Sequence, residues 1–328
     1  MSGWFLVAIY IAMKLEYNKQ TEPFIRSMVE RIQLQDKIRN AVLDMASKIS
    51  IDDNHNYTRV SDGKWLAGVT SVSGLVPKEW LAAWGAKEAV KALGYSDFDG
   101  DTEEAERILR EIRALKDDKV DGKVTKTKVE KYIELLKEAK GAAFRKNKEA
   151  KLDGTRGHEW IENYVKAKMR FEKLPEYPDD KLERPLKQFV EWSDNNVDYY
   201  IVSEAKISDV DVGYAGTLDM VAKMKDMSLA ILDAKFASHI SPDYSLQTAG
   251  YAAAFEKYGI KFDKRIIIRL PKTLEKDEWD KETRKYTKVE NTIEVKEIDT
   301  PYEFDKSTFY QALPVKKWIN YVEKLKQT

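Results

Sequence analysis

The order of hydrophobic and polar positions divides the chain into a helical first part and a mixed second part. Apolar residues recur at helical spacing from Phe24 to Ile49 and from Pro77 to Leu93, a segment that begins with proline and is followed by Gly94. The charged stretch 97–151 contains two further amphipathic segments of helical period. Residues 1–150 are therefore expected to form a mainly helical region.

From residue 151 onward, helical and strand-like segments alternate. Helical spacing is present in three segments, which are His158 to Phe171, Ser241 to Gly259, and Phe304 to Lys326. Runs of β-branched and apolar residues predict strands at Val197–Ile207, Gly213–Met224, Ser228–Phe236 and Lys264–Leu270, and a strand or hairpin within Lys285–Ile298. The polar segment after Phe171 is rich in Pro, Asp and Asn and is expected to be a loop. Residues 151–328 are therefore predicted to be α/β.

The composition narrows the classes of protein that this chain can belong to. Of its 328 residues, 43% are hydrophobic, which is enough to build a sizeable core and argues against global disorder. Its 56 basic and 56 acidic residues give a formal net charge of zero, so any nucleic-acid site must be a local patch. The basic segment Lys140 to Lys151 is either such a patch or a solvated helix face. The absence of cysteine excludes disulfides, thiolate zinc sites, cysteine-ligated iron–sulfur clusters and a cysteine nucleophile.

One apolar stretch, Gly3 to Met13, is long enough to raise the question of a membrane segment. It is about half the length that a spanning helix needs, and it lacks the basic start and the cleavage site of a signal peptide. We expect a buried strand or helix there, or a start of translation at Met13. Neither a signal peptide nor a transmembrane helix is expected.

Candidate chemistry is concentrated at the end of one predicted strand. Asp233 and Lys235 follow the apolar run Leu229 to Leu232, and strand side chains alternate with a period of two, so both side chains share one face. A surface ion pair at a strand end is the simplest interpretation of an Asp-x-Lys sequence on its own.

Asp219 adds a second carboxylate to this face. If the hairpin between the two strands is centred on Asp226, Asp219 pairs with Asp233, and opposed Cβ atoms in such a pair lie about 4.5–5.5 Å apart. Two carboxylates so close repel each other by roughly 1–4 kcal/mol. A divalent cation reverses that sign, and carboxylate oxygens suit Mg²⁺ or Mn²⁺. The model requires an odd-length loop or a bulge, because a slip of one residue sends one carboxylate to the other face.

The order and spacing of several short motifs are more specific than any one of them. The motifs are Gly216-Thr217-Leu218-Asp219, Asp233-Ala234-Lys235 and Gln247-Thr248-Ala249-Gly250-Tyr251. This set resembles the RecB-like branch of the PD-(D/E)xK nucleases, which includes RecB and AddB nuclease domains, Cas4 proteins, mitochondrial genome-maintenance exonucleases and many phage exonucleases. The resemblance covers His158 to Leu270. It implies a restriction-endonuclease-like core, in which a mixed central sheet is flanked by helices.

The resemblance also implies a role for each matching residue. Metal ligands would be His158, Asp219, Asp233 and the carbonyl group of Ala234. Lys235 would be the catalytic lysine, Gln247 and Tyr251 would face the site from one side of a helix, and Glu204 would be an acid on the preceding strand. His158 also shares a helical stripe with Ile161 and Val165, so a core histidine is the alternative.

The implied function is an Mg²⁺- or Mn²⁺-dependent DNA exonuclease that acts on DNA ends or single strands. It would act in phage or mobile-element DNA recombination, repair or processing, with recombination or replication proteins as possible partners. Its location would be the cytoplasm of a bacterial host or phage-infected cell. The segment Val69–Trp84 more loosely resembles the N-terminal segment of phage RecB- or Cas4-like exonucleases. That resemblance would make residues 1–150 a cover over a DNA channel. Three alternatives remain: an endonuclease with the same site, a non-catalytic nucleic-acid-binding recombination partner, and an unrelated α/β protein with a chance match.

Overall fold

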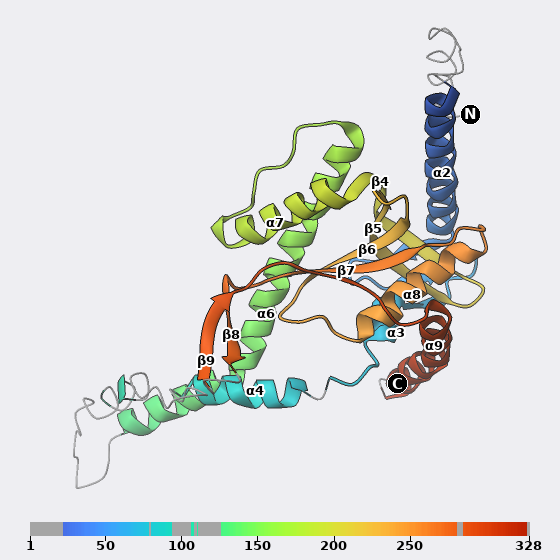
Figure 1. Ribbon diagram of the computed structural model, residues 1–328. Coiled ribbons are helices and arrows are strands. Elements are labelled where there is room, and N and C mark those ends of the chain that lie inside the picture. The colour runs from blue at the N-terminus through green and yellow to red at the C-terminus, as the bar shows by residue number, and fades with distance from the viewer. Residues whose placement is uncertain are drawn as a thin grey trace, which may run out of the picture. The chain divides into compact units, whose positions relative to one another are not determined.

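The computed structural model describes residues 22–78, 80–93, 106–107, 110, 126–280 and 285–326 (Figure 1). The apolar stretch Gly3 to Met13 lies outside these residues, as does most of the first amphipathic segment of 97–151. The chain forms two compact units: one combines the residues up to Val76 with those from Arg156 onward, and the other is Pro77–Thr155.

An eight-stranded mixed sheet is the centre of the first unit. Its strands are β1 (Ile49–Ile51), β2 (Tyr57–Arg59), β3 (Trp65–Gly68), β4 (Val197–Asp209), β5 (Tyr214–Met224), β6 (Leu229–Phe236), β7 (Lys264–Leu270) and β10 (Glu294–Glu297). Seven of them follow the order β1-β2-β3-β5-β6-β7-β10, and β4 pairs with β5. The β3–β5 and β6–β7 pairs are parallel, and the others are antiparallel. The four strands expected between Val197 and Leu270 are therefore confirmed.

One edge of β5 is shared by two strands, and this arrangement creates the site described below. Because β4 pairs along the whole of β5, from Met224 to Tyr214, β3 and β6 must both lie on its other edge. There β6 pairs with residues 220–223, and β3 pairs with residues 214–215. The motif Gly216 to Asp219 falls between these two ladders, at an opening in the sheet.

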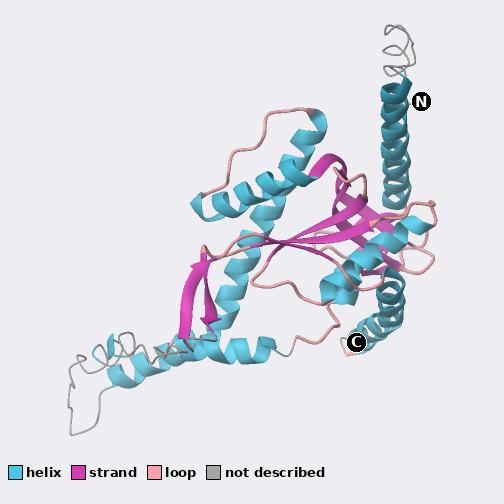
Figure 2. Cartoon of the chain, viewed as in Figure 1, coloured by secondary structure: helices cyan, strands magenta, loops and turns pink. Residues whose placement is uncertain are grey.

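Helices cover both faces of the sheet, as Figure 2 shows. Helices α2 (Glu22–Ser47), α3 (Val69–Ser73), α8 (Asp243–Glu256) and α9 (Tyr302–Leu325) contribute to one buried cluster, in which Met45, Phe255 and Phe309 are nearly inaccessible. The end of α6 (Lys126–Arg170) and α7 (Asp180–Asn196) contribute to a second cluster, around Tyr164 and Phe189. The mixed central sheet flanked by helices is therefore confirmed.

Helix α7 occupies most of the segment that the sequence predicts to be a loop, so that prediction is wrong. The Asp179 side chain caps the helix by accepting a hydrogen bond from the backbone amide of Leu182, at 2.9 Å. Its buried face carries Leu182, Leu186 and Phe189, at spacings of four and three residues. Burial of that face stabilises a helix whose polar composition suggests a loop.

The segment Lys285–Ile298, expected to be a strand or a hairpin, instead contains two strands that belong to different sheets. Strand β9 (Lys285–Glu290) pairs with β8 (Glu275–Asp280) in a separate two-stranded sheet, whereas β10 pairs with β7 at the edge of the main sheet.

The second unit is helical and consists of α4 (Trp80–Lys91) and the first part of α6. Lys146 of α6 forms an ion pair with Glu88 of α4, at 2.5 Å. The helical segments expected around residues 77–93 and 129–139 are therefore present, although α6 runs on without a break into the segment of His158. Helix α2 and strands β1–β3 belong to the first unit, whereas the sequence-based division at residue 150 groups them with the helical segments.

Candidate metal centre

The hairpin formed by β5 and β6 has the register that the sequence predicts. Its ladder runs from Met220↔Leu232 to Lys223↔Leu229, so it is symmetric about Asp226. The amide of Met224 bonds to the carbonyl of Ser228, which leaves a turn of three residues, an odd number, with a left-handed φ of 72° at Met227. One step beyond the ladder, Asp219 and Asp233 stand on the two separating strands, so the predicted register is present but the two acids are not a directly bonded pair of the ladder.

The separation of the strands lets the Asp219 side chain take the place of a ladder partner. Its Oδ2 atom accepts a hydrogen bond from the Ala234 amide at 2.9 Å. This bond ties the Asp219 carboxylate to β6 beside Asp233. The Ala234 carbonyl remains a predicted ligand.

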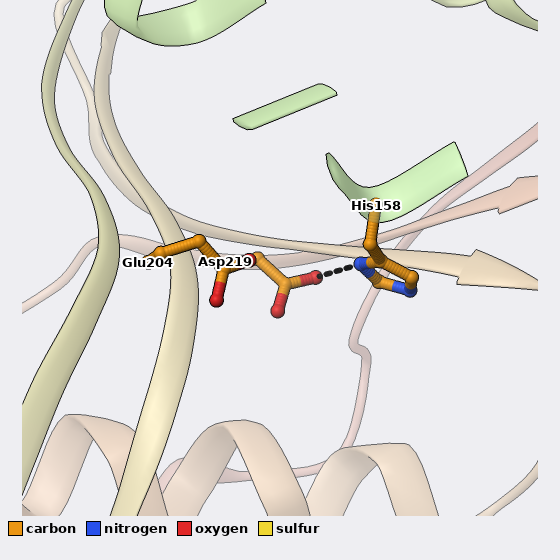
Figure 3. A group of neighbouring side chains, drawn as sticks. All are labelled: His158, Glu204 and Asp219. Carbon is orange, nitrogen blue, oxygen red and sulfur yellow. Dashed lines mark ion pairs between the residues drawn. The ribbon is translucent and has the colours of Figure 1, made fainter. Parts of the chain in front are cut away.

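Glu204 brings a third acid to the same row across the sheet. It lies between the pairs Ser203↔Met220 and Ala205↔Leu218 of β4 and β5, so it stands opposite Asp219. Its φ of 47° is left-handed, a conformation that costs a residue with a side chain about 1–3 kcal/mol and that is concentrated at functional sites. Figure 3 shows its carboxylate beside that of Asp219.

His158 reaches the acids from α6, on the other side of the opening. Its Nδ1 lies 3.6 Å from Asp219 Oδ2, and one potential ligand atom each from His158, Glu204 and Asp219 lie within 4.8 Å of one another (Figure 3). The His158 side chain is 32% exposed, so it is not a core histidine. These three residues could hold one metal ion.

Asp233 lies next to this group but is engaged by other partners. Its side chain is completely buried, and Oδ1 accepts a hydrogen bond from Gln247 Nε2 at 3.1 Å. Oδ2 makes no hydrogen bond of normal geometry and has the Lys235 ammonium nitrogen at 2.6 Å. An orphaned carboxylate oxygen in the protein interior is costly unless a cation is close to it. The Lys235 ammonium group is such a cation, so a metal ion would have to share Asp233 Oδ2 with it.

Gln247 and Tyr251 hold that carboxylate from α8. Gln247 Nε2 donates a second hydrogen bond, at 2.9 Å, to the Tyr251 hydroxyl, which is buried. The two residues therefore share a helix face that looks onto the site, as their spacing of four residues predicts. Gly216 makes this approach possible: a Cβ atom there would lie 3.0 Å from both the Tyr251 ring and Val69.

The three carboxyl groups of the site have raised pKa values, because they are buried and too little positive charge lies near them. Burial, and then the charge of Asp219, raise the pKa of Glu204 to about 8. Burial raises the pKa of Asp233 to about 6, against the lowering effect of Lys235. Burial also raises the pKa of Asp219, whereas Lys235 and the Ala234 amide lower it. A divalent cation would favour the charged form of all three carboxyl groups.

His158 is neutral at physiological pH. Although its side chain is partly exposed, the surrounding protein removes much of the solvation of the imidazole. This effect, and then the charge of Lys235, lower the pKa of His158 to about 4, so its contact with Asp219 is not an ion pair at pH 7. A neutral imidazole has the lone pair that a metal requires. The imidazole of His158 and the two carboxylates of Glu204 and Asp219 form a donor set with more oxygen than nitrogen, which suits a hard divalent cation.

Sequence reasoning missed three neighbours of the site. Glu162 and Lys166 follow His158 on α6 at intervals of four residues, and their charges act in opposite directions on the pKa of Glu204. The ring of Tyr244 lies 5.3 Å from the Lys235 ammonium group. Helical spacing from His158 and Gln247 is the signal that could have identified them.

Comparison with known proteins does not assign the chain to a family. The sequence matches no family model, and a search of the curated proteins finds no match. Across the described residues, no helix combines the length and the apolar character needed to cross a membrane.

Proposed function

We propose that this chain is a metal-dependent deoxyribonuclease of the PD-(D/E)xK type, with a restriction-endonuclease-like core. One observation carries the proposal: the Lys235 ammonium group lies against buried Asp233, beside the group formed by His158, Glu204 and Asp219. A strand-end ion pair has no need of three further metal-ligating side chains around it.

The chain's own residues divide the work of hydrolysis. His158, Asp219 and Asp233 would hold the cation. Glu204 could contribute too, because its carboxylate lies in one group with potential ligand atoms of His158 and Asp219. Bound Mg²⁺ or Mn²⁺ supplies a Lewis acid that lowers the pKa of water and offsets charge on a phosphoryl oxygen. Gln247 orients Asp233 through its amide.

Lys235 has the properties of a residue that stabilises charge during the reaction. The charges of Asp233 and Asp219 raise its pKa and together outweigh burial, which is the largest single effect and lowers it. The side chain is therefore a fixed ammonium group at neutral pH. It can stabilise the negative charge that develops when water attacks a phosphodiester, and it can orient that water.

The narrower proposal is an exonuclease that acts on DNA ends or single strands in phage or mobile-element DNA recombination, repair or processing. The motif order supports it, since the set resembles the RecB/Cas4-like branch. The chain has no cysteine, so it would belong with phage-type members that lack a cysteine-ligated iron–sulfur cluster. The cytoplasm of a bacterial or phage-infected cell would be its location. An endonuclease with the same site would cleave circular DNA, which an exonuclease spares.

The test is cleavage of labelled single- and double-stranded DNA with Mg²⁺ or Mn²⁺. Lys235→Gln and Asp233→Asn are each expected to lower the rate by at least about 10²–10³-fold, because each removes a charge aimed at the reacting centre. Lys206→Gln, on the exposed side of β4, is the control and should retain full activity. Unchanged cleavage in the first two variants, or DNA binding without metal-dependent turnover, would contradict the proposal.

A further inference from the structure

An exposed aromatic residue lies in the middle of a row of lysines on α6, in the second unit. Phe144 is 74% exposed, although phenylalanine is among the residues most often buried. Lysines stand seven and four residues before it and four and seven residues after it, and all four are exposed: Lys137, Lys140, Lys148 and Lys151. At about 100° per residue, the five side chains fall within an arc of about 80° and extend along about 21 Å of the helix.

Phe144 and the four lysines form a basic stripe in which no acidic residue lies. The acids within its length, Glu138 and Glu149, fall about 120° and 140° around the helix from Phe144, at the centre of the stripe. Among the described residues, none of the four ammonium groups has a hydrogen bond or an ion pair. Further along the same helix, Lys166 does pair with Glu162. The four lysines of the stripe therefore differ from Lys166 in having no anionic partner among the described residues.

The stripe also faces away from the helix that packs on α6 in this unit. The packed face carries Ala139, which is buried, and Ala143, which lies 3.9 Å from the position of a Cβ atom on Gly85 of α4. It also carries Lys146, which pairs with Glu88 of α4. In a helix these positions lie about 100–160° around the axis from Phe144, at the centre of the stripe. Packing against α4 therefore leaves the stripe uncovered.

We propose that this basic stripe binds single-stranded nucleic acid, with phosphates on the lysines and an unpaired base stacked on Phe144. Positive charge along the path of the backbone and an aromatic ring for stacking are the features by which proteins bind single strands without sequence preference. Bases in a duplex are stacked on one another and are not available to an exposed ring. The inference deepens the proposed function and rests on it for the choice of nucleic acid as the partner.

The first test is the affinity of the full-length protein for a fluorescent 20-nucleotide oligothymidylate, measured by anisotropy in EDTA so that no cleavage occurs. Phe144→Ala is expected to weaken binding by about fivefold to a hundredfold, and Phe144→Trp to restore it, because one stacked base is lost and regained. A duplex of equal length should bind both variants alike. Phe304→Ala is the matched control, since Phe304 is 67% exposed but stands between Glu303 and Asp305.

The second test concerns the lysines. Each phosphate contact contributes about 0.7 to the slope of log affinity against log salt for a single strand, so Lys140→Gln/Lys148→Gln should lower that slope by about 1.4. Lys324→Gln/Lys326→Gln, which removes two exposed lysines from the end of α9, should leave it unchanged. Circular dichroism of each variant verifies that α6 remains folded.

Several outcomes would overturn the inference: unchanged affinity in the stripe variants, an equal loss on duplex, or binding to phosphatidylserine vesicles that depends on Phe144 without binding to the oligonucleotide. Failure of the proposed function gives a different result. A protein that binds the oligonucleotide through Phe144 but never cleaves DNA supports the stripe and contradicts the nuclease. A protein that cleaves DNA and binds it equally well without Phe144 supports the nuclease and contradicts the stripe.

Discussion

At the scale of single residues, the position of His158 depends on the glycine before it. The Phe236 ring of β6 packs so closely on α6 that a Cβ atom on Gly157 would lie 2.0 Å from it. The same ring meets the His158 imidazole edge-on, with centroids 5.6 Å apart. The missing side chain at Gly157 thus allows α6 to approach the strand end, and His158 reaches Asp219 as a result.

Gly157→Ala is therefore expected to push α6 away from β6. Because Phe236 is buried and cannot swing aside, the overlap should cost about 1–3 kcal/mol of unfolding free energy and should weaken Mn²⁺ binding. Chemical denaturation and a metal titration measure the two effects. Gly141→Ala, on the same helix, is the control: its new Cβ meets only the flexible Arg145 side chain, so stability should rise by up to about 1 kcal/mol. Equal behaviour of the two variants would contradict this role of Gly157.

Residue types and spacing predicted part of this site. The two-residue alternation of β6 placed Asp233 and Lys235 on one face, and the two side chains do meet. The left-handed conformation of Glu204 could not be predicted, because glutamate gives no sequence signal for a positive φ. Helical spacing places Glu162 and Lys166 on the face of His158, but their distance from Glu204 depends on where α6 crosses the sheet, which is a property of packing.

At the scale of elements, the turn between β5 and β6 sets the register that aligns Asp219 with Asp233. Asp226 stabilises this turn by accepting hydrogen bonds from the Ser228 amide and hydroxyl, and from Lys264. Met227 gains no packing in return for its left-handed backbone, since its side chain is 68% exposed.

Met227→Gly should therefore stabilise the protein by about 0.5–1 kcal/mol. Glycine adopts a positive φ without steric cost, and this gain is larger than the extra chain entropy that glycine loses on folding. The midpoint of urea unfolding measures the change. Met227→Ala retains a Cβ atom and is expected to give no gain. A loss of stability in the glycine variant would show that the turn is held in some other way.

Elements formed by neighbouring residues were predicted well, and those that depend on distant residues were not. The β5–β6 hairpin follows from alternation and turn residues over about twenty positions. The parallel pairing of β3 with β5 joins Ala67 to Tyr214, and no local pattern specifies such a partner. Helix α7 was missed because its stability comes from the core that it covers, whereas its own composition is polar.

At the scale of the whole molecule, a net charge of zero conceals strong local separation. Acids converge at the opening between β5 and β6, and lysines align on α6. The consequence for stability is pH dependence in the absence of metal. Between its unfolded pKa, near 4.5, and its folded value of about 8, Glu204 binds a proton in the folded protein that the unfolded chain has released. Stability is therefore lost as the pH rises through this range.

His158 has the opposite effect, but in a lower range. Its pKa is lowered from 6.5 to about 4, so between those values the unfolded chain binds the extra proton and stability rises with pH. The raised pKa of Asp233 acts mainly below about 6. The window from pH 6.5 to 8 is therefore the one in which Glu204 can be followed apart from these two groups.

In EDTA, the midpoint of thermal unfolding is expected to fall between pH 6.5 and pH 8, and Glu204→Gln should reduce that fall because the neutral amide has no proton to lose. Added Mn²⁺ should raise the midpoint of the unmodified protein more at pH 8 than at pH 6.5, since the cation and the proton compete for the same carboxylate. Glu159→Gln, an exposed position on α6, is the control and should follow the unmodified protein. If Glu204→Gln shows the same dependence on pH and Mn²⁺ as the control, Glu204 does not belong to the metal centre.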